Sequence, residues 1–231
     1  MKLKQNLTAD GSILTVATAH TAAGLRQAAG LRKGAFDLVE VRLDCLLRHR
    51  ALLAECLPAL RIPVLLTARH PAEGGANMLA ADARRELLQQ FLPWASALDV
   101  ELRSIATMRV LIELATRRGI PSVLSYHNFR TTPPLSRLRS IVSAARKGGA
   151  SIVKVATALR GASGFARLLL LQAAEGRRGL ATMGMGPLGR ASRLALAAAG
   201  SRLNYGYLDR PQVPGQWPAE RLRDLIGEVR P

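Results

Sequence analysis

The sequence predicts an α/β fold and, within that class, a single-domain (β/α)8 TIM barrel over residues 1–231. The chain has 231 residues, a length that one barrel domain fills. Eight short apolar segments, many of them β-branched, alternate with segments of helical periodicity, as in repeated βαβ units. No linker, low-complexity tract or internal repeat divides the chain. A doubly wound open sheet is the alternative fold.

The elements follow from this alternation in chain order. The first apolar run, 13–19, is short and lacks a convincing processing site, so we interpret it as part of a strand and not as a signal peptide. The eight predicted strands are 12–19, 37–43, 63–67, 97–102, 121–125, 151–155, 180–183 and 203–207. Helical periodicity predicts helices over 46–60, 80–92, 108–118, 136–147, 164–175 and 188–199, and a final amphipathic helix over 218–229.

Composition excludes several classes of protein. With 48% hydrophobic residues the chain is not intrinsically disordered, and no run of 18 apolar residues predicts a membrane span. Two cysteines, Cys45 and Cys56, are too few for a disulfide framework, and no Cys/His cluster has zinc spacing, so we expect a cytoplasmic protein without a metal. The net charge is +17, yet aromatics make up only 4% and the arginines are spread along the chain. This pattern indicates a solvated basic surface, which can attract an anionic substrate, rather than a site for nucleic acid or membrane.

Polar side chains recur towards the ends of the predicted strands. In the second strand and just after it, Glu40, Arg42 and Asp44 alternate with apolar residues, so all three point to one face. Residues of the same kind lie in or after four other predicted strands: Thr67 and Arg69, Asp99 and Glu101, Ser125 with His127 and Asn128, and Lys154. Barrel enzymes build their active sites at the carboxyl ends of the strands. The pattern therefore predicts one polar site at that face.

Lys154 is the most informative of these residues, because it lies between two valines inside an apolar strand. Burial removes the water that stabilises an ammonium group and so favours the neutral amine, which is the form that attacks a carbonyl carbon. A structural Lys–Glu ion pair is the alternative interpretation. Similarly, Glu40 and Arg42 could form a structural ion pair, and His127 could be a loop histidine without a chemical role.

Six short motifs then occur in a fixed order over almost the whole chain. They are Glu40-x-Arg42-x-Asp44, Thr67-x-Arg69 followed by Glu73-Gly74-Gly75, Ser125-x-His127-x-Phe129, Lys154-Val155-Ala156, Ser192-Arg193 and Pro214-Gly215-Gln216. Their order resembles that of type I 3-dehydroquinate dehydratase. The spacing of 27 residues from His127 to Lys154, and of 23 from Arg193 to Gln216, resembles that family's arrangement too. The resemblance implies a (β/α)8 barrel that works through a lysine Schiff base without a metal or organic cofactor.

Carried over residue by residue, the resemblance implies three catalytic residues: Lys154 forms the Schiff base, His127 is the general acid and base, and Glu73 orients His127. The remaining matches imply substrate contacts. Arg193 pairs with the substrate carboxylate, Glu40, Arg42 and Arg69 surround its hydroxyls, Met183 and Tyr205 make apolar contacts, and Gln216 closes over the substrate. The position of Tyr205 is often phenylalanine in the family.

The segment around 208–217 is expected to form a lid loop, and here the chain departs from the family pattern. The family usually carries a serine four residues before the lid glutamine, whereas this chain has Gln212. The change alters one substrate contact. We therefore expect it to affect lid closure and substrate affinity more than the chemistry.

The resulting prediction is a hydro-lyase that converts 3-dehydroquinate into 3-dehydroshikimate, in the shikimate pathway of aromatic amino acid biosynthesis. Its partner is a small-molecule substrate, and a homodimer is the candidate assembly. A relative that binds dehydroquinate or quinate with little turnover is a second hypothesis, which rests on Gln212 alone. Another Schiff-base barrel, such as an aldolase, would share Lys154 but does not explain Arg193 with Gln216. Nucleic-acid binding rests on the charge alone.

Overall fold

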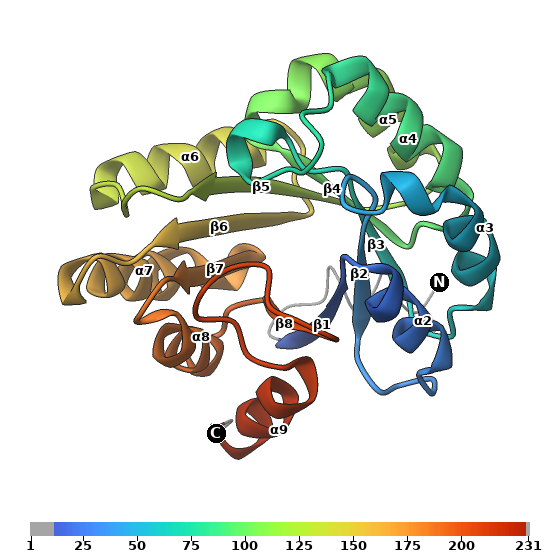
Figure 1. The fold of residues 1–231 in the computed structure, drawn as a ribbon. Helices are drawn as coiled ribbons and strands as arrows, with labels where there is room; N and C mark the ends of the chain where they lie inside the picture. Colours follow the sequence, from blue (N-terminus) through green and yellow to red (C-terminus); the bar gives the residue numbers. More distant parts are fainter. Residues whose placement is uncertain (1–11, 230–231) are drawn as a thin grey trace.

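Eight parallel strands form the centre of the protein, whose computed structural model describes residues 12–229 (Figure 1). The strands are β1 (Leu14–Ala19), β2 (Leu38–Arg42), β3 (Val64–Thr67), β4 (Ala97–Glu101), β5 (Ser122–Asn128), β6 (Ile152–Ala158), β7 (Leu180–Met185) and β8 (Leu203–Tyr207). Each matches one of the eight strands predicted from the sequence.

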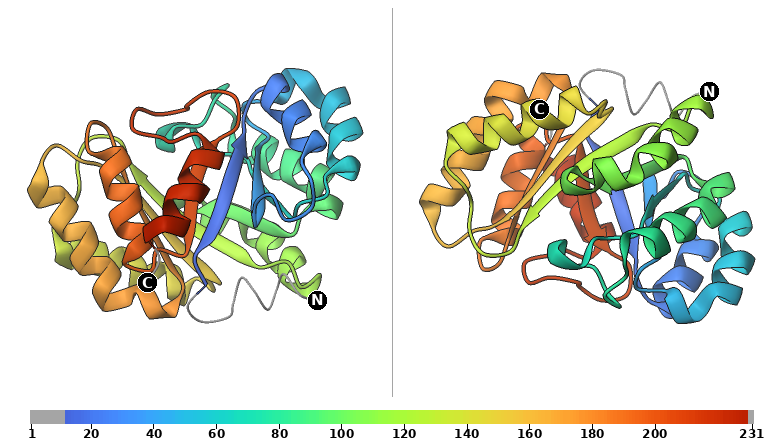
Figure 2. Two further views of the ribbon diagram at one scale, coloured as in Figure 1. Left: turned by 90° about the horizontal axis from the view of Figure 1, so that it is seen from below. Right: turned by 90° about the horizontal axis from the view of Figure 1, so that it is seen from above.

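Helices alternate with the strands and cover the outside of the sheet (Figure 2). They are α2 (Ala22–Gly30), α3 (Arg50–Ala59), α4 (Ala81–Phe91), α5 (Ile105–Arg117), α6 (Leu135–Lys147), α7 (Ala162–Glu175), α8 (Gly189–Ala198) and α9 (Ala219–Val229). Short 3-10 helices lie at Leu47–His49, Pro71–Glu73, Leu92–Trp94, Leu102–Ser104 and Gly176–Arg178. Within residues 12–229, no helix is long and apolar enough to cross a membrane.

The order of the strands identifies a nearly closed (β/α)8 barrel. Neighbours in the sheet follow the order β7-β6-β5-β4-β3-β2-β1-β8, so the strands at the two ends of the chain pair with each other. Between β7 and β8, the Arg202 N–H donates to the Leu180 carbonyl at 2.9 Å. The Thr182 N–H donates to Ser201 Oγ at 3.0 Å. An open doubly wound sheet would instead reverse its strand order at a switch point, so that alternative is wrong.

Two differences from the predicted elements affect the site. Strands β5, β6 and β7 run two or three residues further than the sequence predicted, because their parallel ladders continue through pairs such as His127↔Ala156 and Asn128↔Thr157. Lys154 consequently lies in the middle of β6, not at its end. Helix α2 was not predicted. It buries only Gly24, Leu25 and Ala28, a face too small to give a clear helical period.

Two apolar layers hold the barrel together. Alternate residues of the strands, including Val16, Leu65 and Ile152, fill the interior of the barrel below the polar residues. The other strand residues, such as Val41, Val100 and Val155, pack against the helices in a larger outer layer. Both layers are almost completely buried, so the strand ends that carry the polar residues are held on a rigid frame.

The segment between β8 and α9 crosses one end of the barrel. It lies beside the loop that follows β3, as both views of Figure 2 show. At its start, Asp209 accepts a hydrogen bond from the Thr21 hydroxyl at 2.5 Å. Near its end, the Gly186 N–H donates to the Pro214 carbonyl at 3.0 Å, and the Tyr207 N–H donates to the Trp217 carbonyl at 3.0 Å. The segment is therefore tied to the barrel at both ends.

Candidate active site

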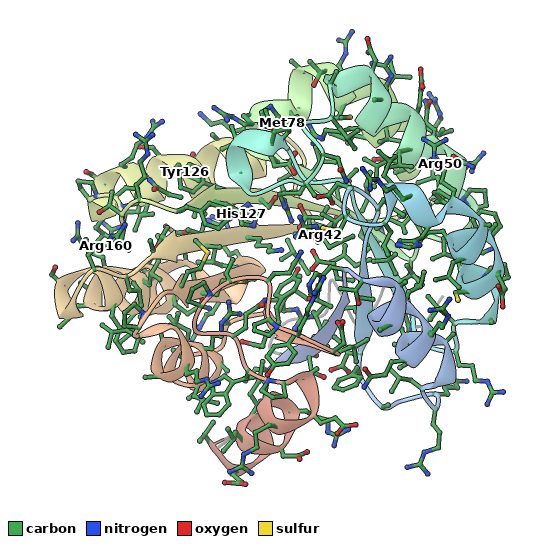
Figure 3. All side chains as sticks on the ribbon, viewed as in Figure 1. Arg42, Arg50, Met78, Tyr126, His127 and Arg160 are labelled. Atoms are coloured by element: carbon green, nitrogen blue, oxygen red, sulfur yellow. The ribbon has the colours of Figure 1, made fainter. Side chains whose placement is uncertain are left out.

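A cavity of about 540 Å³ opens at the carboxyl ends of the strands, under the segment between β8 and α9. All eleven residues that were predicted as catalytic residues or substrate contacts line it: Glu40, Arg42, Arg69, Glu73, His127, Lys154, Met183, Arg193, Tyr205, Gln212 and Gln216. Figure 3 shows two of them, Arg42 and His127, at the centre of the molecule, whereas Arg50 and Arg160 lie at its edge. Side chains from β2, β5, β6, β7, β8 and α8, and from the segments that follow β3 and β8, thus meet in one place.

Lys154 projects from the middle of β6 and is 3% exposed. Its Nζ donates to Asp99 Oδ2 at 3.1 Å and lies 3.7 Å from Glu40 Oε1. The ring of Tyr205 covers the amine from another side, with Nζ 3.9 Å from the ring centroid. The alternative of a structural ion pair is thus partly correct, since two carboxylates contact the amine. The amine nonetheless remains on the cavity wall.

Arg69 lines the cavity and pairs with Asp99, which is buried behind it. The Arg69 guanidinium donates to both oxygens of Asp99, at 2.8 and 2.9 Å, and to Glu101 Oε1 at 3.1 Å. Burial by itself would raise the pKa of Asp99, but the positive charges of Arg69 and Lys154 outweigh it and hold that pKa well below its usual range. Asp99 therefore stays ionised, and it fixes the Lys154 amine with an acceptor that does not take its proton.

His127 and Glu73 form a second pair, and His127 lies on β5, the strand next to that of Lys154. Glu73 Oε2 accepts from the backbone N–H of His127 at 2.9 Å and lies 3.0 Å from its ring Nδ1. Burial, with the charges of Arg69 and Lys154, lowers the pKa of His127 well below its usual value. A neutral ring that donates from Nδ1 to Glu73 leaves the lone pair of Nε2 free, so His127 can act as a base.

Glu73 titrates near neutrality. Burial and the nearby charge of Glu101 raise its pKa to about 7, although the His127 N–H, Arg69 and Arg103 act in the other direction. Arg103 Nε lies 3.8 Å from Glu73 Oε1, and its side chain is 49% exposed. The protonation state of the His127–Glu73 pair therefore changes near pH 7, where Glu73 gains or loses its proton.

Arg193 is a buried cation that lacks a carboxylate partner within residues 12–229. Its Nη1 donates to the Tyr205 carbonyl at 3.0 Å and lies 3.9 Å from Met183 Sδ, while its Nε has no partner. Burial alone lowers its pKa to about 10, so the guanidinium is still charged at neutral pH. An unpaired buried cation on a cavity wall is a strong site for an anion, and the planar fork of arginine suits a carboxylate.

Glu40 and Arg42 do not pair with each other, so that structural alternative is wrong. Arg42 instead forms a bidentate pair with Asp44, at 3.0 and 2.8 Å. Glu40 accepts hydrogen bonds from the hydroxyls of Thr18 and Thr67, at 3.1 and 3.0 Å. These contacts leave Glu40 beside the Lys154 amine and direct Arg42 towards the segment between β8 and α9.

The two glutamines of that segment act on different partners. Gln212 Oε1 accepts from Arg42 Nη1 at 2.9 Å, and its Nε2 lies 3.6 Å from Cys45 Sγ. Gln216 Oε1 accepts from the backbone N–H groups of Gln212 and Val213, at 2.6 and 3.3 Å. Gln216 thus holds the turn of the segment, and Gln212 spans the cavity to Arg42.

Sequence reasoning missed several cavity residues, among them Thr18, His20 and Met185. His20 follows β1 directly, and burial lowers its pKa. Its position after a predicted strand was the signal that could have identified it. Met185 lies in the part of β7 that the sequence had not assigned to a strand. Within residues 12–229, no cluster of three or more His, Cys, Asp or Glu side chains has a metal-binding arrangement.

Comparison with known proteins gives one consistent result. The sequence profile of the family "Type I 3-dehydroquinase" matches residues 13–229. The 3-dehydroquinate dehydratase of Methanothermobacter thermautotrophicus is 34% identical over 196 residues, which cover 84% of this chain and 86% of the relative. That of Pyrococcus abyssi is 34% identical over 204 residues, covering 87% and 92% of the two chains.

Solved structures agree with the sequence comparison. The 3-dehydroquinate dehydratase of Aquifex aeolicus superposes with a TM-score of 0.76 at 29% identity, covering 94% of this chain and 98% of that one. The type I enzyme of Clostridium difficile has a TM-score of 0.84 at 22% identity, covering 95% and 94%, and supports the fold.

Proposed function

This chain belongs to the type I 3-dehydroquinase family, and we propose that it is a hydro-lyase that dehydrates 3-dehydroquinate to 3-dehydroshikimate through a Schiff base on Lys154. The observation that carries the proposal is the combination of three groups on one cavity: a buried amine, a histidine–carboxylate pair and an unpaired buried arginine. An amine attacks a ketone, a base removes a proton, and the arginine holds a carboxylate.

The reaction begins at Lys154. His127 takes a proton from the ammonium, and the neutral amine adds to the substrate ketone. The protonated His127 then gives this proton to the hydroxyl of the adduct, which leaves as water, so that an iminium ion forms and His127 is neutral again. The positive charge of the iminium acidifies the neighbouring C–H bond, and the carboxylates of Asp99 and Glu40 beside Nζ stabilise that charge.

His127 then carries the protons of the elimination. It removes a proton from the carbon next to the iminium, which gives an enamine. The enamine expels the β-hydroxyl, and the protonated His127 returns its proton to the leaving oxygen as water forms. A second water molecule, activated by His127, hydrolyses the product iminium and frees Lys154. Glu73 keeps the ring oriented throughout through its contact with Nδ1.

The other predicted residues hold the substrate. Arg193 pairs with its carboxylate, and Glu40, Arg42 and Arg69 bind its hydroxyls. Met183 and Tyr205 form the apolar wall. The segment 208–217 is the lid of the single barrel domain that residues 12–229 form, with Gln212 and Gln216 as its two polar contacts.

We place the reaction in the shikimate pathway of aromatic amino acid biosynthesis, in the cytoplasm. Free thiols at Cys45 and Cys56 suit a reducing compartment.

The assay that tests the proposed function is the appearance of the conjugated enone absorbance of 3-dehydroshikimate when 3-dehydroquinate is added. Binding of 3-dehydroquinate without that absorbance would favour a non-catalytic relative.

The pH dependence of turnover should report on Glu73. The pKa of its carboxyl is raised to about 7, so activity that needs the ionised carboxylate should fall as the pH drops through 7. The pKa of His127 lies well below 6.5, so its protonation should appear only at lower pH. Glu73→Gln keeps an oxygen acceptor but cannot ionise. A pH profile of kcat for both proteins should therefore show the limb near 7 in the wild type and lose it in the variant.

The lid glutamines should affect substrate binding. Gln212→Ser frees Arg42 for the substrate and should lower KM with kcat largely unchanged. Gln216→Ala removes the acceptor for two backbone N–H groups and should raise KM. Each change should be about fivefold if about 1 kcal/mol of hydrogen bonding is involved. Steady-state kinetics measure both, and an unchanged or higher KM for Gln212→Ser would show that glutamine fully replaces the family's serine.

A further inference from the structure

A second cavity of about 550 Å³ lies beside the first and shares Glu73, His127 and Phe129 with it. The Phe129 ring separates the two, packed so closely on Gly74 that a side chain on that glycine would collide with it. Tyr126 also lines the second cavity, on the opposite side of β5 from the ring of His127 (Figure 3). The second cavity therefore adjoins the His127–Glu73 pair from outside the barrel.

Three arginines line this second cavity: Arg103, Arg130 and Arg137. All three are exposed, and the single carboxylate among the lining residues is the buried Glu73. Arg130 and Arg137 have no carboxylate partner within the described part of the chain, and Arg103 has only the 3.8 Å contact with Glu73. The positive charge of this concave surface is thus largely uncompensated, which favours the entry of an anion.

The loop that carries Arg130 has a fixed shape. Asn128 Oδ1 accepts from the N–H groups of Arg130 and Thr131, at 2.9 and 3.1 Å, and Asn128 Nδ2 donates to the Tyr126 hydroxyl at 3.3 Å. The carbonyl of Arg130 accepts from Arg160 Nε at 2.9 Å. These contacts hold the backbone at Arg130 without using its guanidinium, which remains available to a ligand.

We propose that the second cavity binds a small molecule through an oxyanion group, a carboxylate or a phosphate, held by Arg103, Arg130 and Arg137. The apolar side chains of Leu102 and Ile141 on its wall would contact the carbon skeleton of that molecule. A ligand bound in the second cavity would affect the proposed catalytic pair through Arg103. An anion that pairs with Arg103 weakens the electrostatic attraction between Arg103 and Glu73. The site is therefore a regulatory site for the reaction proposed above.

The direction of the effect follows from the groups that face Glu73. Arg103, Arg69 and the His127 N–H favour its ionised form, and burial with Glu101 opposes it. Neutralising Arg103 raises the pKa of Glu73, so the acid limb of the kcat profile moves to higher pH. Because Arg103 is half exposed, the expected shift is about 0.5 pH unit. Activity falls near pH 6.5 and is unchanged near pH 9.

Sulfate is a suitable probe because it is a dianion over this whole pH range. Calorimetric titration of the complete protein should show one more sulfate bound per chain in the wild type than in the double variant Arg130→Ala/Arg137→Ala. The matched control is Arg117→Ala/Arg139→Ala, which removes the same charge from exposed positions on α5 and α6 and should titrate like the wild type. Equal binding by the wild type and Arg130→Ala/Arg137→Ala would overturn the site. This binding comparison does not depend on turnover, so it remains valid even if the proposed function fails.

Kinetics test the coupling separately. At saturating 3-dehydroquinate and constant ionic strength, sulfate should shift the acid limb of the wild type and of the control, but not of Arg130→Ala/Arg137→Ala. Competition at Arg193 is removed by the saturating substrate. An acid limb that stays in place while the extra sulfate binds would overturn the coupling to Glu73. Titrations with methyl phosphate and succinate then separate a phosphate from a dicarboxylate ligand, and failure of both to bind would contradict a site for organic anions.

Discussion

Replacing Lys154 by alanine is expected to abolish turnover of 3-dehydroquinate, with a fall in kcat of at least about 10³-fold. The variant has no amine at the position where Nζ meets Asp99, Glu40 and the Tyr205 ring, so the iminium cannot form. The enone assay measures the loss directly.

The Lys154→Ala variant should still fold, so that a loss of turnover can be attributed to the missing amine. Asp99 keeps both of its hydrogen bonds from Arg69 when Lys154 is removed. Circular dichroism and thermal unfolding should confirm a folded variant. Lys147→Ala, at the exposed end of α6, is the matched control and should retain full activity. Turnover by Lys154→Ala at the wild-type rate would refute the covalent mechanism.

His127→Ala should lose about 10² to 10⁴ in kcat, the usual contribution of a general acid and base. Among the described residues of the cavity, His127 is a neutral base, and the Glu73 carboxylate orients its ring. Imine formation at Lys154 should still occur slowly in the variant, because the amine is unaltered. A covalent intermediate is therefore expected to accumulate, and mass spectrometry of the intact protein after rapid quenching measures it.

The control for this substitution is His49→Ala, which changes an exposed histidine of the 3-10 helix Leu47–His49. It should behave like the wild type. Normal turnover by His127→Ala would mean that another group moves the proton, and His20, on the same cavity, would be the next residue to replace.

The fold could be predicted because its signal is local and repeated. Each strand is a short apolar run between helical segments, and a barrel places all strand ends at one face. The site residues were therefore predictable as a group, because polar residues such as Glu40, Arg69 and His127 at or near the ends of apolar strands are typical of a barrel active site. The resemblance to a family then gave each of them a role.

The partners of these residues could not be predicted, since they depend on which strands become neighbours across the barrel. The sequence indicated that burial would favour a neutral Lys154, but it did not show that Asp99 and Glu40 would both contact the amine. Asp99 comes from β4 and Glu40 from β2, and only the closed sheet brings them to β6.

The contacts of the lid could not be predicted either, because they join residues that are even further apart in the sequence. Gln212 was recognised as a departure from the family pattern, but its contact with Arg42 joins residues 170 positions apart. Strand ends were also uncertain, because Thr157 and Met185 continue their strands through hydrogen bonds to neighbours, which residue type does not reveal. The predicted strand ends were wrong by only two or three residues. The longer β6 nonetheless places Lys154 in the middle of its strand and not near its end.

The central claim is that the reaction passes through a covalent bond between substrate and Lys154. Sodium borohydride reduces an imine to a stable secondary amine, so it should inactivate the enzyme only when 3-dehydroquinate is present. Peptide mapping by mass spectrometry should place the adduct on Lys154. Unimpaired activity after this treatment, or an adduct on Lys33 or Lys147 in place of Lys154, would contradict the account.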